Sequence, residues 1–303
     1  MTHIGNTPLL KLEKILPPDC AEVYVKYEGA NPTGSMKDRM ALSMIEDAEA
    51  RGLLKPGYRV LDYTGGSTGS SLAMICAVKG YRAHFVSSDA FSEEKLQTMR
   101  AFGATLDLVP SDHGKITKQV IAEAQKRVEA LRQEPETFWT NQFNNPANRS
   151  AYHRMADEIL HALDGRLDEF VAGVGTGGCF SGNAEVFKSP GRAIRCIAVE
   201  PDRVRALSGG DVSGSHRLEG IGAGFIPSIF RADLADQIIP VTDEDAFATA
   251  RLLARREGIF GGISSGANVW AAIQRAKALG AGKRVVTVIC DSGLKYLNGD
   301  LFR

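Results

Sequence analysis

The segment Arg59-Val60-Leu61-Asp62-Tyr63-Thr64-Gly65-Gly66-Ser67-Thr68-Gly69 joins a short β-branched run to a glycine-rich turn, and a helix is predicted from Thr68 to Lys79. The same order of strand, turn and helix recurs along the chain, which is the pattern of βαβ units wound around parallel sheets. The predicted fold class is therefore α/β. The predicted strands are Glu22–Tyr27, Arg59–Tyr63, Ala83–Ser87, Thr105–Val109, Glu169–Gly173, Ile194–Glu200 and Arg284–Cys290.

The chain has 303 residues, which suggests two lobes at roughly 150 residues each. Helices are predicted at Met36–Arg51 and Asp243–Glu257 from their apolar faces. The charged segment Lys115–Glu134 predicts a surface helix. Pro135 or the Asn-rich stretch Asn141–Asn148 is the expected crossing between the lobes.

Lysine and arginine together number 36 and so do the acids, so no net field would gather nucleic acid or an anionic membrane. The five cysteines are widely spaced without a CxxC pair, which argues against disulfides and a thiolate metal site. His84, His153 and His216 are isolated, and no metal is predicted. The N-terminus has no basic segment before an apolar run, and no apolar stretch approaches about 18 residues, so a cytoplasmic location is expected.

Lys37 lies where the turn Asn31-Pro32-Thr33-Gly34-Ser35-Met36 runs into a helix. Ser35 is predicted as the N-cap, with Asp38 completing a capping box. The positive end of the helix dipole disfavours an ammonium in this first turn, and an uncharged amine is what a Schiff base requires. A solvated lysine that pairs with Asp38 or Glu28 is the alternative interpretation.

Two glycine-rich turns, Thr64–Gly69 and Gly173–Gly178, each lie between a predicted strand and a helix. Backbone N–H groups and the helix dipole converge on an anion at such a place. The hydroxyls of the first turn suit a carboxylate or a phenolic oxygen, and the second turn is the better phosphate cradle. Tight turns that bind no ligand are the alternative.

The turn Gly173–Gly178 also matches G-x-G-x-x-G, and Glu200 ends the next predicted strand, as a dinucleotide-binding unit requires. Against this interpretation, the motif follows four earlier strands. It also leaves the first glycine turn and the helix start at Lys37 without a role. A nicotinamide-dependent dehydrogenase is therefore the remote alternative.

Six blocks of sequence are specific in their order and spacing: Ile4–Leu9, Lys26-x-Glu28 with Asn31–Arg39, Gln142-Phe143 with Asn145–Asn148, Gly173–Gly178, Glu219–Phe225, and Gly262–Ala267. Together they resemble the cysteine synthase (O-acetylserine sulfhydrylase) family of fold-type II pyridoxal-phosphate enzymes over nearly the full chain. The resemblance implies a two-lobed α/β fold of mostly parallel twisted sheets with helices on both faces. It implies a smaller domain at residues 38–145 and a larger one formed by residues 1–37 and 146–303, with the cofactor between them.

The resemblance makes Lys37 the Schiff-base lysine for pyridoxal 5'-phosphate. It assigns the pyridine nitrogen to Ser264, and the phosphate to a loop made of Gly175, Thr176, Gly177, Gly178 and Cys179. A neutral hydroxyl at the nitrogen restrains the ring as an electron sink, which suits loss of a β-substituent better than transamination. Without the resemblance, Ser264-Ser265 would be predicted only as an N-cap before a helix at Ala267–Ala278.

The substrate carboxylate is assigned by the same resemblance to the loop Thr64, Gly65, Ser67 and Thr68, with Gln142 opposite and Gly220 as a further contact. The family usually has Thr-Ser-Gly-Asn-Thr-Gly in this loop. Here Gly65 replaces the serine, and Ser67 replaces the asparagine that normally bonds the phenolic oxygen of the cofactor. Cys179 replaces a usual threonine. The two loop departures predict room for a bulkier or more polar β-substituent or nucleophile.

The implied reaction is β-replacement on an activated L-serine such as O-acetylserine. Lys37 removes and returns the Cα proton, and sulfide or another nucleophile gives L-cysteine or an analogue. β-Elimination to pyruvate and ammonia is one alternative, and a binding paralogue without turnover is another. The resemblance also implies a homodimer, with the C-terminal tail of serine acetyltransferase as a possible partner.

Overall fold

The chain folds into two compact units in the computed structural model, which describes residues 3–113 and 117–303. One unit joins Met1–Met36 to Arg149–Arg303, and the other is Lys37–Asn148. The chain therefore crosses from one unit to the other before Lys37 and after Asn148, whereas the sequence led us to expect the crossings after residues 37 and 145. Lys37 is the first residue of the second unit.

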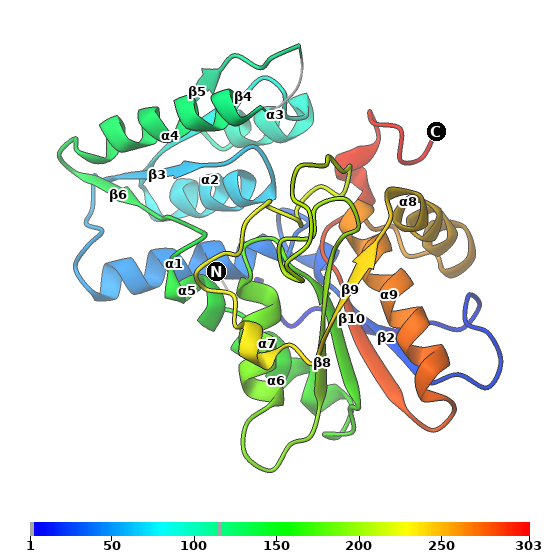
Figure 1. Cartoon of the computed structure of the whole chain (residues 1–303). Helices are drawn as coiled ribbons and strands as arrows, with labels where there is room; N and C mark the ends of the chain where they lie inside the picture. The colour runs from blue at the N-terminus through cyan, green and yellow to red at the C-terminus, as the bar shows by residue number, and fades with distance from the viewer. Residues whose placement is uncertain (1–2, 114–116) are drawn as a thin grey trace. The chain divides into compact units, whose positions relative to one another are not determined.

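The first unit is built on a six-stranded sheet with the strand order β1-β2-β10-β7-β8-β9. All neighbouring strands run parallel except β1 and β2. Helices α6 and α7 lie on one side of this sheet and α8 and α9 on the other (Figure 1). The bounds are β1 Leu9–Lys11, β2 Glu22–Tyr27, β7 Glu169–Gly173, β8 Arg195–Pro201, β9 Gln237–Val241, β10 Arg284–Ile289, α6 His153–Ala162, α7 Gly178–Phe187, α8 Asp243–Leu252 and α9 Ile263–Leu279.

The core of this unit explains why its central strands are almost continuously apolar. Every residue of β7 is buried, as is usual for a parallel strand covered on both faces. Val171 and Ile197 of the sheet pack in one cluster with Ala267 and Ala271 of α9. Small side chains let α9 approach the sheet closely. The loops that follow β7 and β10 therefore start from a rigid base.

The second unit contains a four-stranded parallel sheet with the order β5-β4-β3-β6. Leu61, Val86 and Val109 from three of its strands pack against Val120 and Val128 of α4, while α1 and α2 lie on the other face (Figure 1). The bounds are β3 Arg59–Tyr63, β4 Arg82–Ser88, β5 Thr105–Val109, β6 Thr137–Trp139, α1 Lys37–Ala50, α2 Ser67–Lys79, α3 Glu93–Ala101, α4 Lys118–Arg132 and α5 Pro146–Ser150.

The α/β class is confirmed, and each strand predicted from sequence is present to within one residue at either end. Three short strands were not predicted. β1 and β6 have three residues each, too few to show an alternating pattern. β9 contains Pro240, which argues against a strand. It forms because β9 is an edge strand, where one missing backbone N–H is tolerated.

Several helix ends differ from the predictions. α1 begins at Lys37, so Met36 holds the N-cap position, and Ser35 instead forms an isolated bridge with Asp291. α9 begins at Ile263, which places Ser264 inside its first turn. α8 ends at Leu252 and continues as one π-helical turn, Leu253–Glu257. Of the helix predicted at Lys115–Glu134, residues 115 and 116 lie outside the described residues.

Candidate functional site

The turn that precedes Lys37 is fixed to the end of β10. The Met36 amide donates to the Cys290 carbonyl over 2.8 Å, and the Ser292 amide donates to the Gly34 carbonyl over 2.9 Å. Gly34 has a φ of 70°, a conformation that glycine adopts without a steric penalty. The half-buried Lys37 is thus presented at a helix start whose preceding turn is rigid.

Lys26 belongs to the same sequence block as Lys37 but is fully engaged elsewhere. Its ammonium donates to the Thr7 carbonyl at 2.6 Å and pairs with the Glu158 carboxylate at 2.7 Å, and only 2% of the side chain is exposed. The Thr7 hydroxyl in turn donates to Glu28 over 2.6 Å. These contacts join the opening block to the Lys26 block, and they make Lys26 part of the scaffold.

Asp38, next to Lys37, connects two helices of the second unit. Its buried carboxylate accepts a hydrogen bond of 2.6 Å from the Ser71 hydroxyl on α2. The contact holds the start of α1 against the first turns of α2. The Asp38 of the predicted capping box therefore serves packing between helices.

The glycine-rich loop after β3 is closed by its own threonine. The Thr64 hydroxyl oxygen accepts from the Gly69 amide at 3.1 Å. Thr68 donates to Oε1 of Gln142 over 2.9 Å, and Nε2 of Gln142 donates to the Tyr63 carbonyl over 3.1 Å. The structure therefore brings Thr68 and Gln142 together, 74 residues apart in sequence.

A buried carboxylate beneath this loop was not singled out from the sequence. Asp62 accepts from the Thr140 hydroxyl at 2.5 Å and from the Tyr63 amide at 2.8 Å. Burial raises the pKa of Asp62 to about 6, even though these hydrogen bonds act in the opposite direction. An acidic residue inside an otherwise apolar strand is the signal that could have identified it.

Gly65 does not leave the open space that the sequence predicted. A Cβ built on Gly65 would lie 1.8 Å from Cδ2 of Phe91, so the Phe91 ring already fills that position. Ser67 is half-buried at the start of α2, and within the described residues its hydroxyl makes no hydrogen bond. The expectation of extra room is therefore wrong at Gly65, and Ser67 presents an uncommitted hydroxyl.

The second glycine-rich loop, in the first unit, leads from β7 into α7. Gly177 has a φ of 88° immediately before the first helical residue, Gly178. Gly175 packs so closely on Gly220 that a Cβ there would lie 2.1 Å from the Gly220 carbonyl oxygen. Backbone amides in the first turn of a helix lack internal partners, so this loop offers an anion site at the α7 start.

Two further loop residues are buried near that helix start. Thr176 is 9% exposed, and its hydroxyl oxygen lies 3.5 Å from the Gly178 amide. Cys179 is 6% exposed, and its carbonyl accepts from Asn183 at 2.8 Å. Both are thus held in place by the loop and helix to which they belong.

The base of the loop Gly173–Gly178 is held by Asn268, which was not identified from the sequence. Its Oδ1 accepts from the Gly173 amide at 2.7 Å, and its Nδ2 donates to the Val288 carbonyl at 2.9 Å. The residue is fully buried on α9. It therefore fixes the carboxyl end of β7 relative to that of β10.

Ser264 and Ser265 have different surroundings in the first turn of α9. Ser265 accepts from the Cys290 amide at 3.0 Å. Ser264 is 4% exposed, and among residues 3–113 and 117–303 its hydroxyl finds no hydrogen-bond partner. A hydroxyl of a buried residue that has no protein partner is available to a bound ligand atom.

The residues set aside in the sequence analysis behave as expected for structural groups. His153 pairs with Glu185 at 2.7 Å, and His216 bonds to the Gly222 carbonyl at 3.0 Å. Burial raises the pKa of Cys76 and of Cys196 to about 12. No cluster of three His, Cys, Asp or Glu side chains suited to a metal is found in the described part of the chain.

Glu200 does not present a carboxylate to a nucleotide ribose. It accepts from the Leu207 amide at 2.8 Å and from the Ser208 hydroxyl at 2.5 Å, and it is 1% exposed. Both oxygens therefore bind the loop that follows β8. This arrangement removes the feature on which the dinucleotide alternative depended.

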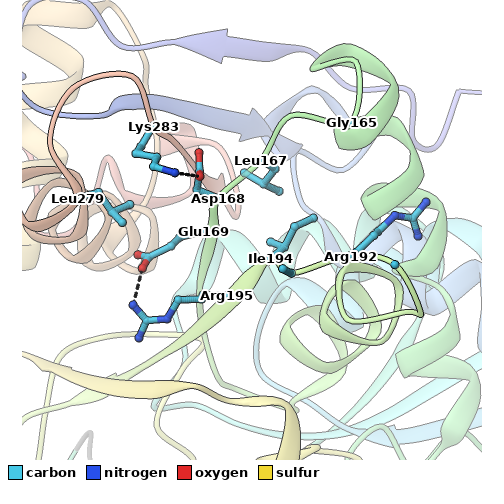
Figure 2. Close-up of a pocket in the computed structure, with 11 residues that line it drawn as sticks. Gly165, Leu167, Asp168, Glu169, Arg192, Ile194, Arg195, Leu279 and Lys283 are labelled. Carbon is cyan, nitrogen blue, oxygen red and sulfur yellow. Dashed lines mark hydrogen bonds and ion pairs between the residues drawn. The ribbon is translucent and has the colours of Figure 1, made fainter.

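A cavity of about 420 Å³ opens at the amino ends of β7 and β8 (Figure 2). Lys283 pairs with Asp168 at 3.0 Å and Arg195 with Glu169 at 2.9 Å, while Arg192 donates to a nearby serine hydroxyl at 2.7 Å. Ligands of parallel sheets bind at the carboxyl ends of the strands. The cavity lies at the opposite, amino ends of the strands. The charged side chains that line it already bond to other protein groups.

Comparison with known proteins is consistent across sequence and structure. A family model described as "Pyridoxal-phosphate dependent enzyme" matches residues 1–291. A cysteine synthase of Staphylococcus aureus is 43% identical over 301 residues, covering 99% of this chain and 95% of the relative. A hydrogen sulfide-producing enzyme from Fusobacterium nucleatum superposes with a TM-score of 0.91 at 41% identity, covering 98% of this chain and 96% of that one.

A cysteine synthase from Entamoeba histolytica superposes with a TM-score of 0.92 at 37% identity, covering 99% of this chain and 89% of that chain. Each of these similarities extends over nearly the whole of both chains. Within the residues that the structure describes, every helix is too short or too polar to cross a bilayer.

Proposed function

The chain belongs to the family of pyridoxal-phosphate-dependent enzymes, and from this premise we propose that it replaces the β-substituent of an activated L-serine with sulfide or a related nucleophile. L-Cysteine or an analogue is the product, in keeping with the cysteine synthases that it resembles. The observation that carries the proposal is the hydrogen bond between Thr68 and Gln142. It holds the Gln142 side chain beside the start of α2, and after the bond to the Tyr63 carbonyl one N–H of Gln142 Nε2 remains for an amino-acid carboxylate.

The residues present fit pyridoxal 5'-phosphate. The loop Gly175–Cys179 supplies amides at the start of α7 for the phosphate group. Ser264 and Ser67 each offer a hydroxyl that is not used within the described residues, as the pyridine nitrogen and the phenolic oxygen require. Lys37 offers the primary amine for covalent attachment.

When bound, pyridoxal phosphate supplies an electron sink for the negative charge that develops at the substrate Cα. Lys37 would hold the cofactor through its amine, and the same amine would take the Cα proton of the substrate and later return it. Thr64, Thr68 and Gln142 hold the carboxylate, with Gly220 near the phosphate loop as a further contact. The neutral Ser264 hydroxyl limits how much charge the ring accepts, which favours departure of the β-substituent.

β-Elimination is the second candidate, because the chain is also 41% identical to a hydrogen sulfide-producing enzyme. Elimination and replacement share the removal of the Cα proton and the loss of the β-substituent. They differ only in whether water or a second nucleophile acts afterwards. The same residues therefore serve either reaction.

Titration of the purified protein with O-acetyl-L-serine separates these functions. Replacement requires acetate release, with cysteine formed when sulfide is added. Elimination gives pyruvate at the same rate with or without sulfide. A binding paralogue gives a shift in the visible absorption of the cofactor without acetate release, and absence of any cofactor absorption would contradict the family premise.

The proposed small-molecule partners are an amino acid and a sulfide-like nucleophile. A homodimer, the C-terminal tail of serine acetyltransferase as a partner, and a cytoplasmic location remain expectations from the resemblance. Light scattering of the purified chain, alone and with a peptide of that tail, measures the first two. A mass of 32.6 kDa in solution would contradict the dimer.

A further inference from the structure

Phe91 occupies the place of a side chain at position 65. A Cβ built on Gly65 would lie 1.8 Å from Cδ2, 2.0 Å from Cε2 and 2.0 Å from Cγ of the ring. The Phe91 amide donates to the Ser88 carbonyl over 3.2 Å, directly after β4. No side chain fits at position 65 unless the ring moves, so Gly65 and Phe91 form one interlocked contact.

A second contact of the same kind lies one helical turn further on. A Cβ built on Gly69 would lie 2.3 Å from the sulfur of Met99 on α3. The segment Phe91–Met99 therefore covers two glycines of the carboxylate loop and its helix start with apolar side chains. Gly66 is different, because a Cβ there would meet no described atom within 4 Å. Apolar side chains therefore cover the loop at Gly65 and Gly69, whereas no described atom covers it at Gly66.

We propose, on the basis of the function given above, that Phe91 is a specificity-determining residue that restricts the β-substituent to small uncharged groups such as an acetyl ester. An aromatic wall offers no hydrogen bond to a phosphoryl oxygen, and burying a charged group against it carries a desolvation cost. A methyl group, in contrast, packs well on a ring.

The test compares Phe91→Ala with Phe102→Ala, a matched control at the C-cap of α3 and outside the segment Phe91–Met99. The quantity measured is the ratio of kcat/KM for O-phospho-L-serine to that for O-acetyl-L-serine, with sulfide as nucleophile. Removing the wall is expected to raise this ratio at least tenfold, a typical effect of reshaping a pocket. The control is expected to change it less than twofold. An unchanged ratio in folded, cofactor-loaded Phe91→Ala overturns the proposal.

A double-mutant cycle in Gly65→Ser and Phe91→Ala tests the contact itself. Gly65→Ser alone is expected to lower the Tm, and Phe91→Ala is expected to relieve most of that loss because it empties the space for the serine. Additive Tm changes would overturn the interlocked contact, and with it the proposal.

Failure of the proposed function is recognised separately. If the unmodified protein turns over neither serine derivative, that function is wrong. The affinities of the two derivatives, read from the cofactor absorption without turnover, then decide the role of Phe91. A tenfold shift of their ratio in Phe91→Ala supports the proposal, and an unchanged ratio overturns it.

Discussion

Lys26 and Lys37 differ in burial and in their place in the fold. Lys26 is buried between a carbonyl and a carboxylate of its own unit, and exchanging those partners would leave Glu158 charged and poorly solvated. Lys37 is half-buried at the first position of a helix. A Schiff-base lysine has to change partners in every turnover, and the surroundings of Lys26 do not suit that task.

Lys37→Ala is therefore expected to abolish covalent attachment of the cofactor and to lower turnover by at least about a thousandfold, with the fold retained. The control is Lys26→Met, which should reduce stability because it removes the nearer of the two cations that pair with the Glu158 carboxylate. It should nevertheless keep the cofactor on Lys37. Borohydride reduction and peptide mapping locate the attachment. A label on Lys26 or Lys295 would show that the assignment is wrong.

The raised pKa of Asp62 predicts that the free energy of unfolding depends on pH. Burial raises its pKa from 3.8 to about 6, so between pH 4 and 6 the folded chain binds the proton more tightly than the unfolded chain. Stability from this group is complete below pH 4 and is lost as the pH rises through about 6, by up to about 3 kcal/mol.

Asp62→Asn should remove this loss, because Thr140 can rotate to accept from the new amide and donate to the Leu61 carbonyl, 3.3 Å away. The measurement is Tm from pH 4 to pH 8 for both proteins. As the pH rises from 4 to 8, the Tm of Asp62→Asn should increase relative to the Tm of the parent protein. Parallel curves would mean that Asp62 does not titrate in this range.

At the scale of elements, the strands were predictable because burial on both faces leaves an uninterrupted β-branched run, as in Arg284–Ile289. The edge strand β9 was not, because Pro240 contradicts the local rule and only its place in the sheet permits it. The helix start at Lys37 was misjudged by one residue. The bridge between Ser35 and Asp291 joins segments far apart in sequence, so no local pattern could reveal it.

The start of α7 predicts how cofactor affinity responds to substitution. Gly177 has a positive φ, and a Cβ there would lie 2.9 Å from Cβ of Phe230, so Gly177→Ala already strains the loop. Gly177→Asp adds a negative charge at the proposed phosphate site. The aspartate variant is expected to bind pyridoxal phosphate at least tenfold more weakly than the alanine variant.

Ser264→Ala provides the comparison for the other end of the cofactor. Loss of one hydroxyl should cost roughly 0.5–1.5 kcal/mol of binding, less than the change at Gly177. Equilibrium dialysis of the three variants measures these affinities. Equal affinities for Gly177→Ala and Gly177→Asp would place the phosphate elsewhere.

At the scale of the whole molecule, most of the candidate site came from the resemblance, since the contacts are long-range. Gln142 meets Thr68 across 74 residues, and neither composition nor spacing relates the two. The contacts of Phe91 and Asn268 are also long-range, and both residues were missed. Each belongs to no motif, and only the folded chain shows that Phe91 covers Gly65 and that Asn268 fixes Gly173.

Removing the cofactor should lower the stability of the whole chain, because a ligand that binds only the folded state stabilises it by mass action. At a free cofactor concentration of 100 times Kd the gain is about 2.7 kcal/mol, which corresponds to a Tm increase of roughly 4 °C for a chain of this size. Pyridoxal without phosphate cannot use the amides at the start of α7, so it should restore only a small part of that increase. Lys37→Ala should keep the part of the Tm increase that the phosphate supplies.

Tm values of the apoprotein with pyridoxal phosphate, pyridoxal and inorganic phosphate separate these contributions. Pyridoxal and pyridoxal phosphate are compared at the same free concentration. If pyridoxal then raises the Tm of the apoprotein as much as pyridoxal phosphate does, the loop Gly175–Cys179 contributes no phosphate binding, and its assignment is wrong.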